Sequence, residues 1–579
     1  MIKRILSISI IFVAVILALT SCELFSHKHS WSEWSVTTQK VACETDGVEE
    51  RSCTCGEKET RSIPAHTYDY KELVEPTQTK DGYTEYTCSA CGYIHKDNFV
   101  DAKGTAGLTY SKNSDGKSCT ITGLGSCTDT EIAIPTSIDG YTVTAIGKEA
   151  FLQCNNLTYV NLPNTIEIID DYAFNHCLRI QEIVLSDSLV SIGDYSFIGC
   201  YNLKSIEIPD SVKNIGIYAF AECKKLESFV IPNGITTISE YMFLNCTSLS
   251  GVVIPDSVTT IDMHAFNGCK NLNNIVIPDG VTKIGMYAFA RCESLTKINI
   301  PDNITTINEG VFNECKSLTS IKIPDKVTSI GANAFSDCTA LESILIPGEV
   351  TSIGFYAFEN CTTLTSIVIP DGVTTISYGL FSGCKNLESI TLGNRVTVIE
   401  GGVFSRCVKL RSIDLPESIT DIYSNAFHEC ESLTSVTLPK SLTYIASDLF
   451  AGCKNLVSVD IPNSVTTISI RAFSGCTSLE GVVIPDGNTV IDYEVFFGCT
   501  NLSSIVVPKS VTYVDMKAFF GCNNLDSIYY YGSEEDWNKI TFEYANEDFI
   551  NANRYYYSEK EPVGEGMFWR WVDGIPTPW

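Results

Sequence analysis

A strict internal period of 23 residues runs through most of this chain and restricts its fold more than any other feature. A cysteine recurs every 23 residues, without exception, from Cys154 to Cys522. A phenylalanine stands three positions before each of these cysteines, from Phe151 to Phe519. Fourteen of the sixteen complete units carry proline at the tenth position. A constant period of about 20 to 50 residues is typical of a solenoid, whose units bury their apolar side only against their neighbours.

The unit that begins at Cys269 shows what each coil is expected to form. Ile275 and Ile277 have the period-two spacing of a short strand. The following Pro278-Asp-Gly predicts a turn, because proline fixes φ and glycine permits a positive φ. One coil has no core of its own, so we expect leucine to stack on leucine and phenylalanine on phenylalanine in continuous columns.

This unit resembles the BspA-type leucine-rich repeat of bacterial and protist surface proteins, over residues 126–522. The resemblance implies a repeat solenoid of leucine-rich units with short strands, capped at both ends and preceded by a small Cys/His-rich region. Cysteine occupies the first position, where leucine-rich repeats usually carry an asparagine ladder. We divide the chain into a lipoprotein signal peptide (1–21), an anchor linker (22–26), Cys/His modules (27–101), an N-terminal cap with an irregular first repeat (102–153), the solenoid (154–522) and a C-terminal cap (523–579).

The cysteine column has two interpretations, a redox or metal-binding array and a column of small buried side chains. Coils in register stack about 4.8 Å apart. Parallel Cβ atoms at that spacing are too far apart for an unstrained disulfide, which needs about 3.8 Å. We therefore favour buried thiols with weak hydrogen bonding.

The first residues predict an export signal. Met1 to Arg4 is a short basic start, and an apolar run follows from Ile5 to Leu19. A bilayer span needs about 20 residues, so this run fits a secretory signal better than a membrane helix. The tetrad that ends at Cys22 (Leu-Thr-Ser-Cys) resembles a bacterial lipobox, which implies a diacylglycerol on Cys22 and a stable two-chain membrane anchor. The alternative is an ordinary signal peptide cut nearby, with Cys22 incidental.

Residues 27–101 hold four of the seven histidines and five of the 25 cysteines, in two loose copies. They resemble short zinc-ribbon-like modules that precede repeats in bacterial surface proteins. The first copy has Cys-x-Cys in place of Cys-x-x-Cys, and the second has Gln78 where a third cysteine would align. The candidate ligands of a structural Zn2+ are Cys43, Cys53 and Cys55 with His66 or His29 in the first copy, and Cys88, Cys91, His66 and His95 in the second.

Such a metal would supply folding free energy to a segment that has little core. The alternative is disulfide bonding, such as Cys88–Cys91 or Cys43–Cys53, because an exported segment meets an oxidising environment. No catalytic zinc is implied, since no general base accompanies an open coordination position.

Charge and motifs exclude several functions. The formal net charge is −29, from 69 acidic and 40 basic side chains. Binding to a nucleic-acid backbone needs clustered Lys and Arg, so we exclude a nucleic-acid partner. The chain has no Gly-x-Ser-x-Gly, no phosphate loop and no dinucleotide fingerprint. We expect a protein that is not an enzyme.

The most informative variable column lies two residues before each phenylalanine. It carries aromatic residues in the N-terminal half and mostly small or charged ones later. The aromatic members are Tyr172, Tyr195, Tyr218, Tyr241, His264, Tyr287 and Tyr356. Exposed, this stripe would be a partner-binding surface; the alternative is an intramolecular stacking ladder. The neighbouring column holds Ile217, Met263, Met286, Phe355 and Tyr378.

A second variable row follows the inward isoleucine of each predicted strand. Its members from the middle of the solenoid are Glu207, Val230, Val253, Val276, Asn299, Lys322, Leu345 and Val368. The sequence leaves open whether this row is exposed or covered.

The C-terminal segment departs from the period. Ser533-Glu-Glu-Asp536 predicts the start of a helix with a capping box. Residues 568–575 predict a hairpin with an Asp-Gly turn, and its tryptophans (Trp569, Trp571), together with Trp579, are expected to act as capping bulk.

Together these features indicate a lipid-anchored protein of the bacterial cell surface that acts as an adhesin or protein-binding scaffold. The expected partner is a host or bacterial surface protein. A glycan-capture lipoprotein, in which the tyrosines stack on sugar rings, is the alternative. An enzyme, or an inhibitor of one, would need a convergent polar pocket that the sequence does not offer.

Overall fold

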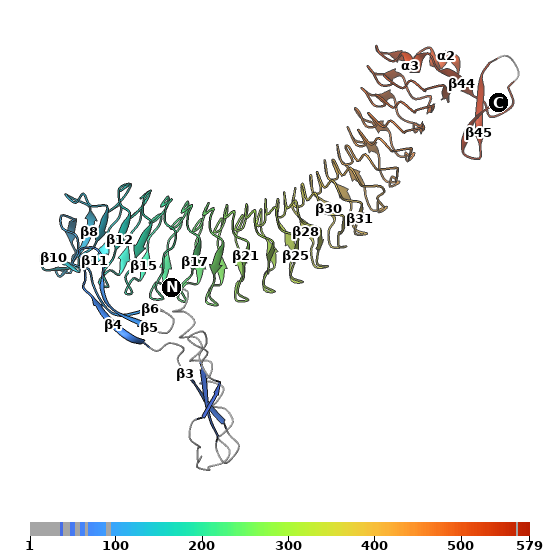
Figure 1. Ribbon diagram of the computed structural model, residues 1–579. Coiled ribbons are helices and arrows are strands. Elements are labelled where there is room, and N and C mark those ends of the chain that lie inside the picture. Colours follow the sequence, from blue (N-terminus) through green and yellow to red (C-terminus); the bar gives the residue numbers. More distant parts are fainter. Residues whose placement is uncertain (1–34, 39–46, 53–57, 64–67, 89–93, 563–565) are drawn as a thin grey trace. The chain divides into compact units, whose positions relative to one another are not determined.

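A computed structural model describes residues 35–38, 47–52, 58–63, 68–88, 94–562 and 566–579. The chain divides into two compact units, Met1–Lys103 and Gly104–Trp579 (Figure 1). Within the described ranges, no helix combines the length and the apolar character that a membrane crossing requires.

The first unit contains two antiparallel sheets of three strands each. In both sheets, strands that neighbour each other are also consecutive in the chain. The first sheet is built from β1 (Ser35–Thr38), β2 (Gly47–Ser52) and β3 (Lys58–Ile63), and the second from β4 (Tyr68–Val74), β5 (Gly82–Cys88) and β6 (Ile94–Val100).

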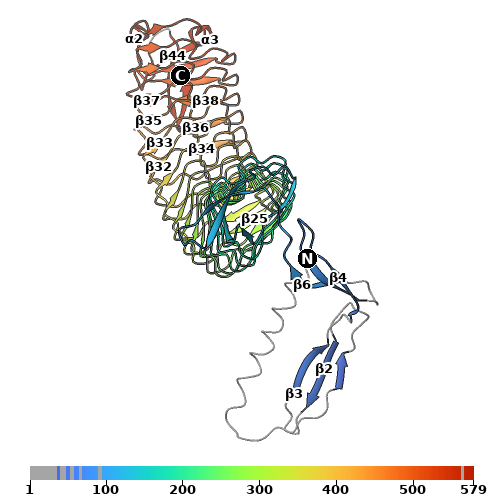
Figure 2. The ribbon, with the colours of Figure 1, turned by 90° about the vertical axis from the view of Figure 1, so that its left-hand side faces the viewer.

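The second unit is a solenoid of stacked coils, and this confirms the predicted fold class (Figures 1 and 2). Most coils contribute a short strand at the predicted Ile-x-Ile segment, and the coils at Ile206 and Ile413 do not. Paired strands are parallel and in register by one period; Ile275, for example, pairs with Ile298. This first strand series comprises β12 (Tyr159–Asn161), β14 (Glu182–Val184), β17 (Ser228–Val230), β19 (Gly251–Val253), β21 (Asn274–Ile275), β23 (Lys297–Ile298), β25 (Ser320–Lys322), β27 (Ser343–Leu345), β29 (Ser366–Val368), β31 (Ser389–Thr391), β34 (Ser435–Thr437), β36 (Ser458–Asp460), β38 (Gly481–Val483), β40 (Ser504–Val507) and β42 (Ser527–Tyr530).

A second strand series follows the turn of each coil, which carries the proline in fourteen of the sixteen units. Its strands have two residues, and the second of these, usually isoleucine, points into the core. The series comprises β13 (Ile168–Ile169), β15 (Ser191–Ile192), β16 (Asn214–Ile215), β18 (Thr237–Ile238), β20 (Thr260–Ile261), β22 (Lys283–Ile284), β24 (Thr306–Ile307), β26 (Ser329–Ile330), β28 (Ser352–Ile353), β30 (Thr375–Ile376), β32 (Val398–Ile399), β33 (Asp421–Ile422), β35 (Tyr444–Ile445), β37 (Thr467–Ile468), β39 (Val490–Ile491) and β41 (Tyr513–Val514).

The phenylalanines form an uninterrupted stacked column through the core. From Phe151 to Phe519, the ring centroids of successive coils lie 5.1 to 6.1 Å apart. Offset stacking at such distances adds to the free energy gained by burying the rings. The predicted stacking of phenylalanine on phenylalanine is confirmed.

The cysteines form a parallel column of buried thiols without disulfides. From Cys177 to Cys522, each Sγ donates a hydrogen bond of 3.0 to 3.4 Å to the carbonyl of the phenylalanine 26 residues earlier. The same carbonyl accepts the amide of the cysteine in its own coil, as Phe174 does from Cys177 at 3.2 Å. The thiol therefore satisfies the second lone pair of a buried carbonyl and links consecutive coils.

The N-terminal cap consists of a hairpin and the predicted irregular first coil. The hairpin pairs β7 (Thr109–Lys112) with β8 (Ser118–Gly123). The first coil consists of β9 (Glu131–Ala133), β10 (Ser137–Ile138) and β11 (Tyr141–Ile146), and β11 joins the hairpin to the second strand series.

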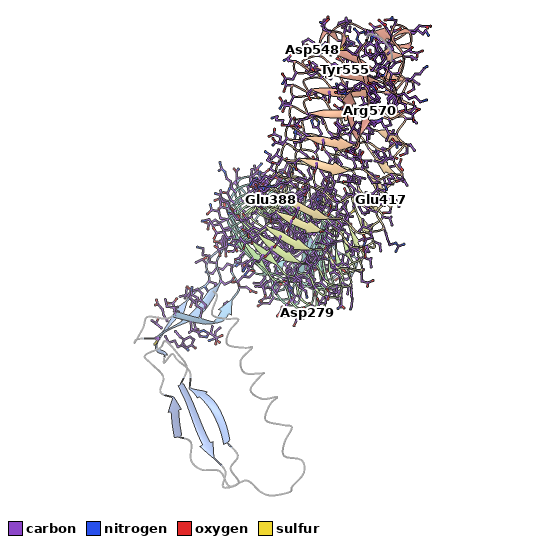
Figure 3. All side chains as sticks on the ribbon, turned by 90° about the vertical axis from the view of Figure 1, so that its right-hand side faces the viewer. Asp279, Glu388, Glu417, Asp548, Tyr555 and Arg570 are labelled. Atoms are coloured by element: carbon purple, nitrogen blue, oxygen red, sulfur yellow. The ribbon has the colours of Figure 1, made fainter. Side chains whose placement is uncertain are left out.

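The C-terminal cap continues the core columns with residues outside the period. Helix α3 (Glu547–Ile550) places Phe549 on Phe519, with ring centroids 4.1 Å apart. The Asn546 and Asp548 side chains accept the amides of Phe519 and Gly521, which a further coil would otherwise accept. Figure 3 shows Asp548 at this end of the stack. Polar backbone groups at the end of the solenoid are thus paired.

Helix α2 and the C-terminal hairpin of this cap match the sequence predictions. Helix α2 (Glu534–Trp537) begins with the capping box at Ser533. The antiparallel hairpin of β45 (Phe568–Val572) and β46 (Ile575–Pro578) turns at Asp573-Gly574, both of which have positive φ. Strands β43 (Thr541–Phe542) and β44 (Asn553–Tyr557) extend the two strand series by one step each.

We expect the thiol column to make the solenoid sensitive to alkali. Burial raises the pKa of the column thiols, to about 12 for Cys315, Cys384 and Cys453. In the unfolded chain these thiols ionise near pH 9, so their contribution to stability is complete below about pH 8 and is lost as the pH rises from about 9 towards 12. Under reducing conditions we expect the free energy of unfolding to fall by about 1.4 kcal/mol per pH unit for each thiol in that window.

The matched variant replaces Cys315, Cys384 and Cys453 by alanine. Unfolding monitored by circular dichroism between about pH 7 and 11 should show a shallower alkaline decline for this variant than for the wild type. Identical slopes would contradict the assignment of the alkaline sensitivity to the thiols.

Candidate interaction surfaces

The predicted aromatic stripe is a stacked ladder in the structure. Six side chains from consecutive coils lie face to face, with ring centroids 4.3 to 5.1 Å apart and planes inclined by 4° to 11°. We call this set the aromatic ladder; its members are Tyr172, Tyr195, Tyr218, Tyr241, His264 and Tyr287. All are half-buried.

An unusual backbone conformation holds the ladder in place. Each of its residues has φ between 54° and 57°, in the left-handed region that non-glycine residues adopt rarely. Polar residues of the same column later in the chain, such as Asn425 and Lys517, share this conformation. The repeat, and not the aromatic side chain, therefore fixes the backbone, and stacking offsets part of the conformational cost.

Stacking leaves only the ring edges of the inner members accessible, since each face contacts a neighbouring ring. At the N-terminal end of the ladder, Lys148 Nζ lies 5.8 Å from the ring centroid of Tyr172. At the other end, Tyr287 lies against Gly310. The Tyr287 hydroxyl donates to Glu309 Oε1 at 2.8 Å, and burial together with this bond raises the pKa of Tyr287 to about 12.

Tyr356 lies outside the ladder. Its ring meets Tyr378 edge-on, with centroids 5.5 Å apart, and also meets Phe355 edge-on. Phe355, Tyr378 and the more N-terminal Met286 are exposed, whereas Ile217 and Met263 are half-buried. The stripe of tyrosines is thus divided into a six-member ladder and a separate aromatic cluster around Tyr356.

Glycines at the ends of these aromatic runs are a feature that the sequence analysis missed. Gly310 and Gly379 follow Tyr287 and Tyr356 by one period each. A Cβ atom at either glycine would clash with the tyrosine ring that lies over it. The sequence does contain the signal, which is a glycine in the aromatic column one period after a tyrosine.

The row that the sequence left undecided is exposed over most of its length. We call it the outward row: the residues that follow the inward residue of each strand in the first series. Exposure reaches 60% of the side chain at Val253 and 77% at Leu345. The exposed apolar members are Val230, Val253, Val276, Leu345, Val368 and Val483. Between Val368 and Val483 the row is polar, with Thr391, Asp414, Thr437 and Asp460.

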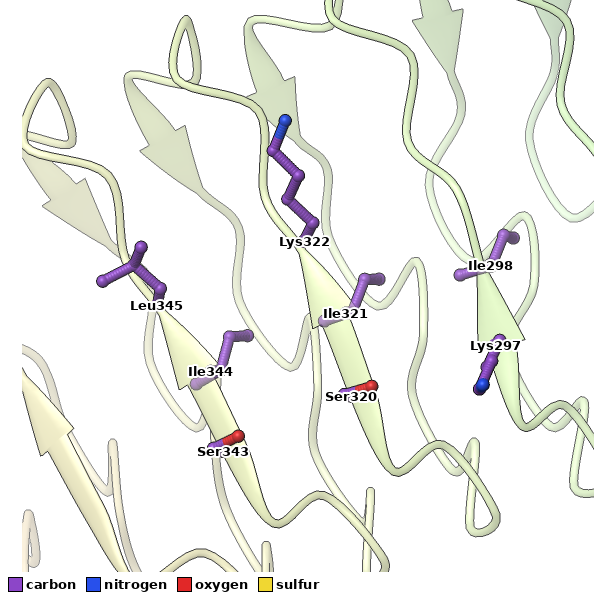
Figure 4. A pocket seen from close by; sticks show the side chains of 8 residues that line it. All are labelled: Lys297, Ile298, Ser320, Ile321, Lys322, Ser343, Ile344 and Leu345. Atoms are coloured by element: carbon purple, nitrogen blue, oxygen red, sulfur yellow. The ribbon is translucent and has the colours of Figure 1, made fainter.

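A shallow depression lies on the same face at β23, β25 and β27 (Figure 4). Ile298, Ile321 and Ile344 form its floor, and Lys322 and Leu345 project beside it. The hydrogen bonding of the first strand series is interrupted between β23 and β25, where the depression lies. Its lining combines apolar and cationic groups without a convergent set of catalytic side chains.

The outward row is covered at its C-terminal end by the chain itself. Trp569 of β45 is fully buried, and it packs against Val506 and Tyr529. Tyr555 of β44, labelled in Figure 3, and Trp571 pack against this cluster. Trp569 thus acts as the predicted capping bulk by covering Val506 and Tyr529 of the outward row.

The predicted anchor Cys22 and most candidate zinc ligands lie outside the described residues. These ligands are His29, Cys43, Cys53, Cys55, His66 and Cys91. The structure places Cys88, which is buried, at the end of β5, and His95 on β6 opposite Tyr86. Within the described ranges, no group of three His, Cys, Asp or Glu side chains is arranged to hold a metal.

Comparison with known families identifies the repeat. The profile of the BspA type leucine-rich repeat region (six copies) matches residues 144–273, 236–365, 351–480 and 420–548. The chain belongs to the BspA-type leucine-rich repeat family. The family resemblance seen in the sequence is thereby confirmed for the solenoid. A search of curated proteins found no match to the chain.

Solved structures of bacterial leucine-rich repeat proteins are similar to this BspA-type chain. One from Bacteroides ovatus shares 28% identity and covers 77% of this chain and 99% of its own, with a TM-score of 0.42. A leucine rich cell surface protein from Faecalibacterium prausnitzii shares 26% identity and covers 76% of this chain and 98% of its own, with a TM-score of 0.34. A protein from Eubacterium ventriosum shares 27% identity and covers 60% of this chain and 93% of its own, with a TM-score of 0.38.

Two glycines of the aromatic column provide a test of the ladder's end. Gly310 and Gly402 have the same left-handed conformation, but a Cβ atom at Gly402 would contact nothing within 4 Å. We expect Gly310→Ala to destabilise the protein by about 1–3 kcal/mol more than Gly402→Ala, because only the former displaces a tyrosine ring. Chemical unfolding of both variants measures the difference in the free energy of unfolding. Equal decreases would show that the contact between the Tyr287 ring and Gly310 does not stabilise the protein.

Proposed function

We propose that this BspA-type protein is a lipid-anchored cell-surface scaffold, or adhesin, that binds other proteins through the outward row. The observation that carries the proposal is the exposure of valine and leucine at equivalent positions of consecutive coils. Val230, Val253 and Val276 form one such run, and Leu345 with Val368 forms another. Contiguous exposed apolar side chains on a rigid sheet are typical of protein interaction sites.

The geometry of the aromatic ladder favours a protein partner over a glycan. A sugar ring binds an aromatic side chain by lying on its face, and the faces inside the ladder are occupied by neighbouring rings. The ring edges and hydroxyl groups can still contribute to the rim of a protein interface, where polar contacts predominate. We therefore keep Tyr172, Tyr195, Tyr218, Tyr241, Tyr287 and Tyr356 as rim candidates.

Export and anchoring rest on the first residues of the chain. The signal-like start and the lipobox-like sequence ending at Cys22 support a membrane anchor on that cysteine. A similar solved protein from Faecalibacterium prausnitzii is described as a cell surface protein. We propose that the Cys/His region, with structural Zn2+, separates the solenoid from the membrane.

The anchor can be tested by substitution. In cells grown with a radiolabelled fatty acid, the wild type should incorporate label and sediment with membranes. Cys22→Ser should lose the label and appear in the soluble exported fraction, because the thioether cannot form. A Cys154→Ser variant controls for cysteine loss, and label retained by Cys22→Ser would contradict the proposed anchor.

Protein binding can be tested with a panel of host extracellular proteins, bacterial surface proteins and glycans. We expect protein ligands whose affinity falls by about tenfold or more in the double variant Val276→Asp/Leu345→Asp, since both side chains would form the apolar centre of the interface. Thr437→Asp, at the same position of a polar coil, is the matched control and should bind normally.

A second variant tests the rim. Replacing Tyr195, Tyr218 and Tyr241 by alanine should weaken the same ligands less than the double variant does, provided that unfolding experiments show the variant to be folded. Ligands restricted to glycans, or protein ligands unaffected by Val276→Asp/Leu345→Asp, would contradict the proposed function.

A further inference from the structure

The C-terminal hairpin shows what kind of group the outward row accepts. Trp569 lies against Val506 and Tyr529, with its ring centroid 5.5 Å from that of Tyr529. Its Nε1 donates to the carbonyl of Tyr530 at 3.1 Å. The indole ring also meets the rings of Tyr531, Tyr557 and Trp571, with centroids 5.0, 5.1 and 5.4 Å away, so it is buried largely among aromatic side chains. Tryptophan suits such a seat, since it has a large apolar ring and one polar edge.

This covered site and the exposed sites belong to one row. Val483 pairs with Val506, and Val506 pairs with Tyr529 in the parallel sheet. In the N-terminal half, Val230 pairs with Val253 in the same way. Exposure separates the two regions, since Val506 is 2% exposed and Val253 is 60% exposed.

One stretch of sequence occurs in both halves of the row, and its outward valine is exposed in both, as Val253 and Val483. Gly251-Val-Val-Ile-Pro-Asp256 and Gly481-Val-Val-Ile-Pro-Asp486 are identical. The second stretch forms β38, directly beside the strand that carries Val506. At Gly251 a Cβ atom would meet nothing within 4 Å, so the space beside Val253 is open. The patch formed by Val230, Val253 and Val276, which we call the valine patch, is therefore an open apolar surface in the same row as the tryptophan seat.

Charge around the valine patch favours one type of partner. Glu207 lies next to Val230 in the outward row, and the turns at the patch edge carry Asp256 and Asp279, all of them exposed. The chain as a whole has a formal net charge of −29. A partner with positive charge beside its apolar group would be attracted, and an acidic one repelled.

We propose that the valine patch binds an extended segment of a partner protein that presents a tryptophan or tyrosine beside basic side chains. The aromatic ring lies across Val230, Val253 and Val276, as Trp569 lies across Val506 and Tyr529. The basic groups face Glu207, Asp256 and Asp279. This inference rests on the proposed function and identifies the class of partner that the outward row recognises.

The probe for this site is the chain's own hairpin. A head-to-tail cyclised peptide of residues 566–579 with Asp573→Asn keeps a favoured Asn-Gly turn and carries one net positive charge from Arg570. We expect saturable binding of this peptide to the full chain by isothermal titration calorimetry. Val253→Asp should weaken it by about tenfold, whereas Thr437→Asp should change it by less than about twofold. Val253 is exposed, so thermal unfolding should confirm that both variants are folded.

Two further peptides test the recognised features. The same peptide with Trp569→Ala should lose most of its binding, because the ring that fills the seat is missing. The peptide with the native Asp573 is neutral and should bind more weakly at low salt than the peptide with Asp573→Asn. Equal binding of these last two peptides would overturn the requirement for basic side chains.

The outcomes separate this inference from the proposed function. The inference is overturned if the peptide does not bind, or if Val253→Asp and Thr437→Asp weaken it equally. Either result leaves the proposed function standing when panel proteins still lose affinity in Val276→Asp/Leu345→Asp. Peptide binding that depends on Val253, without any protein ligand in the panel, would support the inference and count against the proposed function.

Discussion

Backbone hydrogen bonds between equivalent positions of consecutive coils set the geometry of the solenoid, and the bond from each cysteine thiol to the phenylalanine carbonyl of the preceding coil adds to them. Each carbonyl accepts two donors, the amide of its own coil and the Sγ of the next, as Phe174 does from Cys177 and Cys200. Because this arrangement recurs at every step, equivalent residues of successive coils lie one above another. Core positions thereby become columns, and outward positions become continuous rows.

Columns of identical groups need an ending, and the C-terminal cap supplies one with residues outside the period. Phe549 extends the phenylalanine column, and Asn546 accepts the amide of Phe519. The same cap covers the end of the outward row with Trp569. Termination of the core and occupation of the surface thus occur in one segment, which makes the hairpin a built-in example of how the row accepts an aromatic side chain.

Much of the fold could be predicted because the period reports on packing directly. An invariant Cys and Phe at fixed spacing required stacked columns, and both were found. The surface was harder to predict. Tyr218 and Tyr241 could have been exposed rings or stacked ones, since the sequence gives their spacing but not the left-handed backbone that turns their faces together. Likewise Val253 and Val506 are equivalent in the repeat, yet one is exposed and the other covered, because the side chain of Trp569, more than 60 residues away along the chain, packs on the second.

The sequence by itself determined the repeat, the register of its strands, the buried thiols and the places where the solenoid starts and ends. These properties follow from the period, because they depend only on contacts within one coil and with the coils next to it. Only the tertiary structure decided which surface rows are open, how the tyrosine rings are oriented and what covers Val506 and Tyr529. The exposure of a side chain also depends on contacts with segments outside the repeat, such as the C-terminal hairpin. The repeat pattern does not predict those contacts, so only the folded structure shows them.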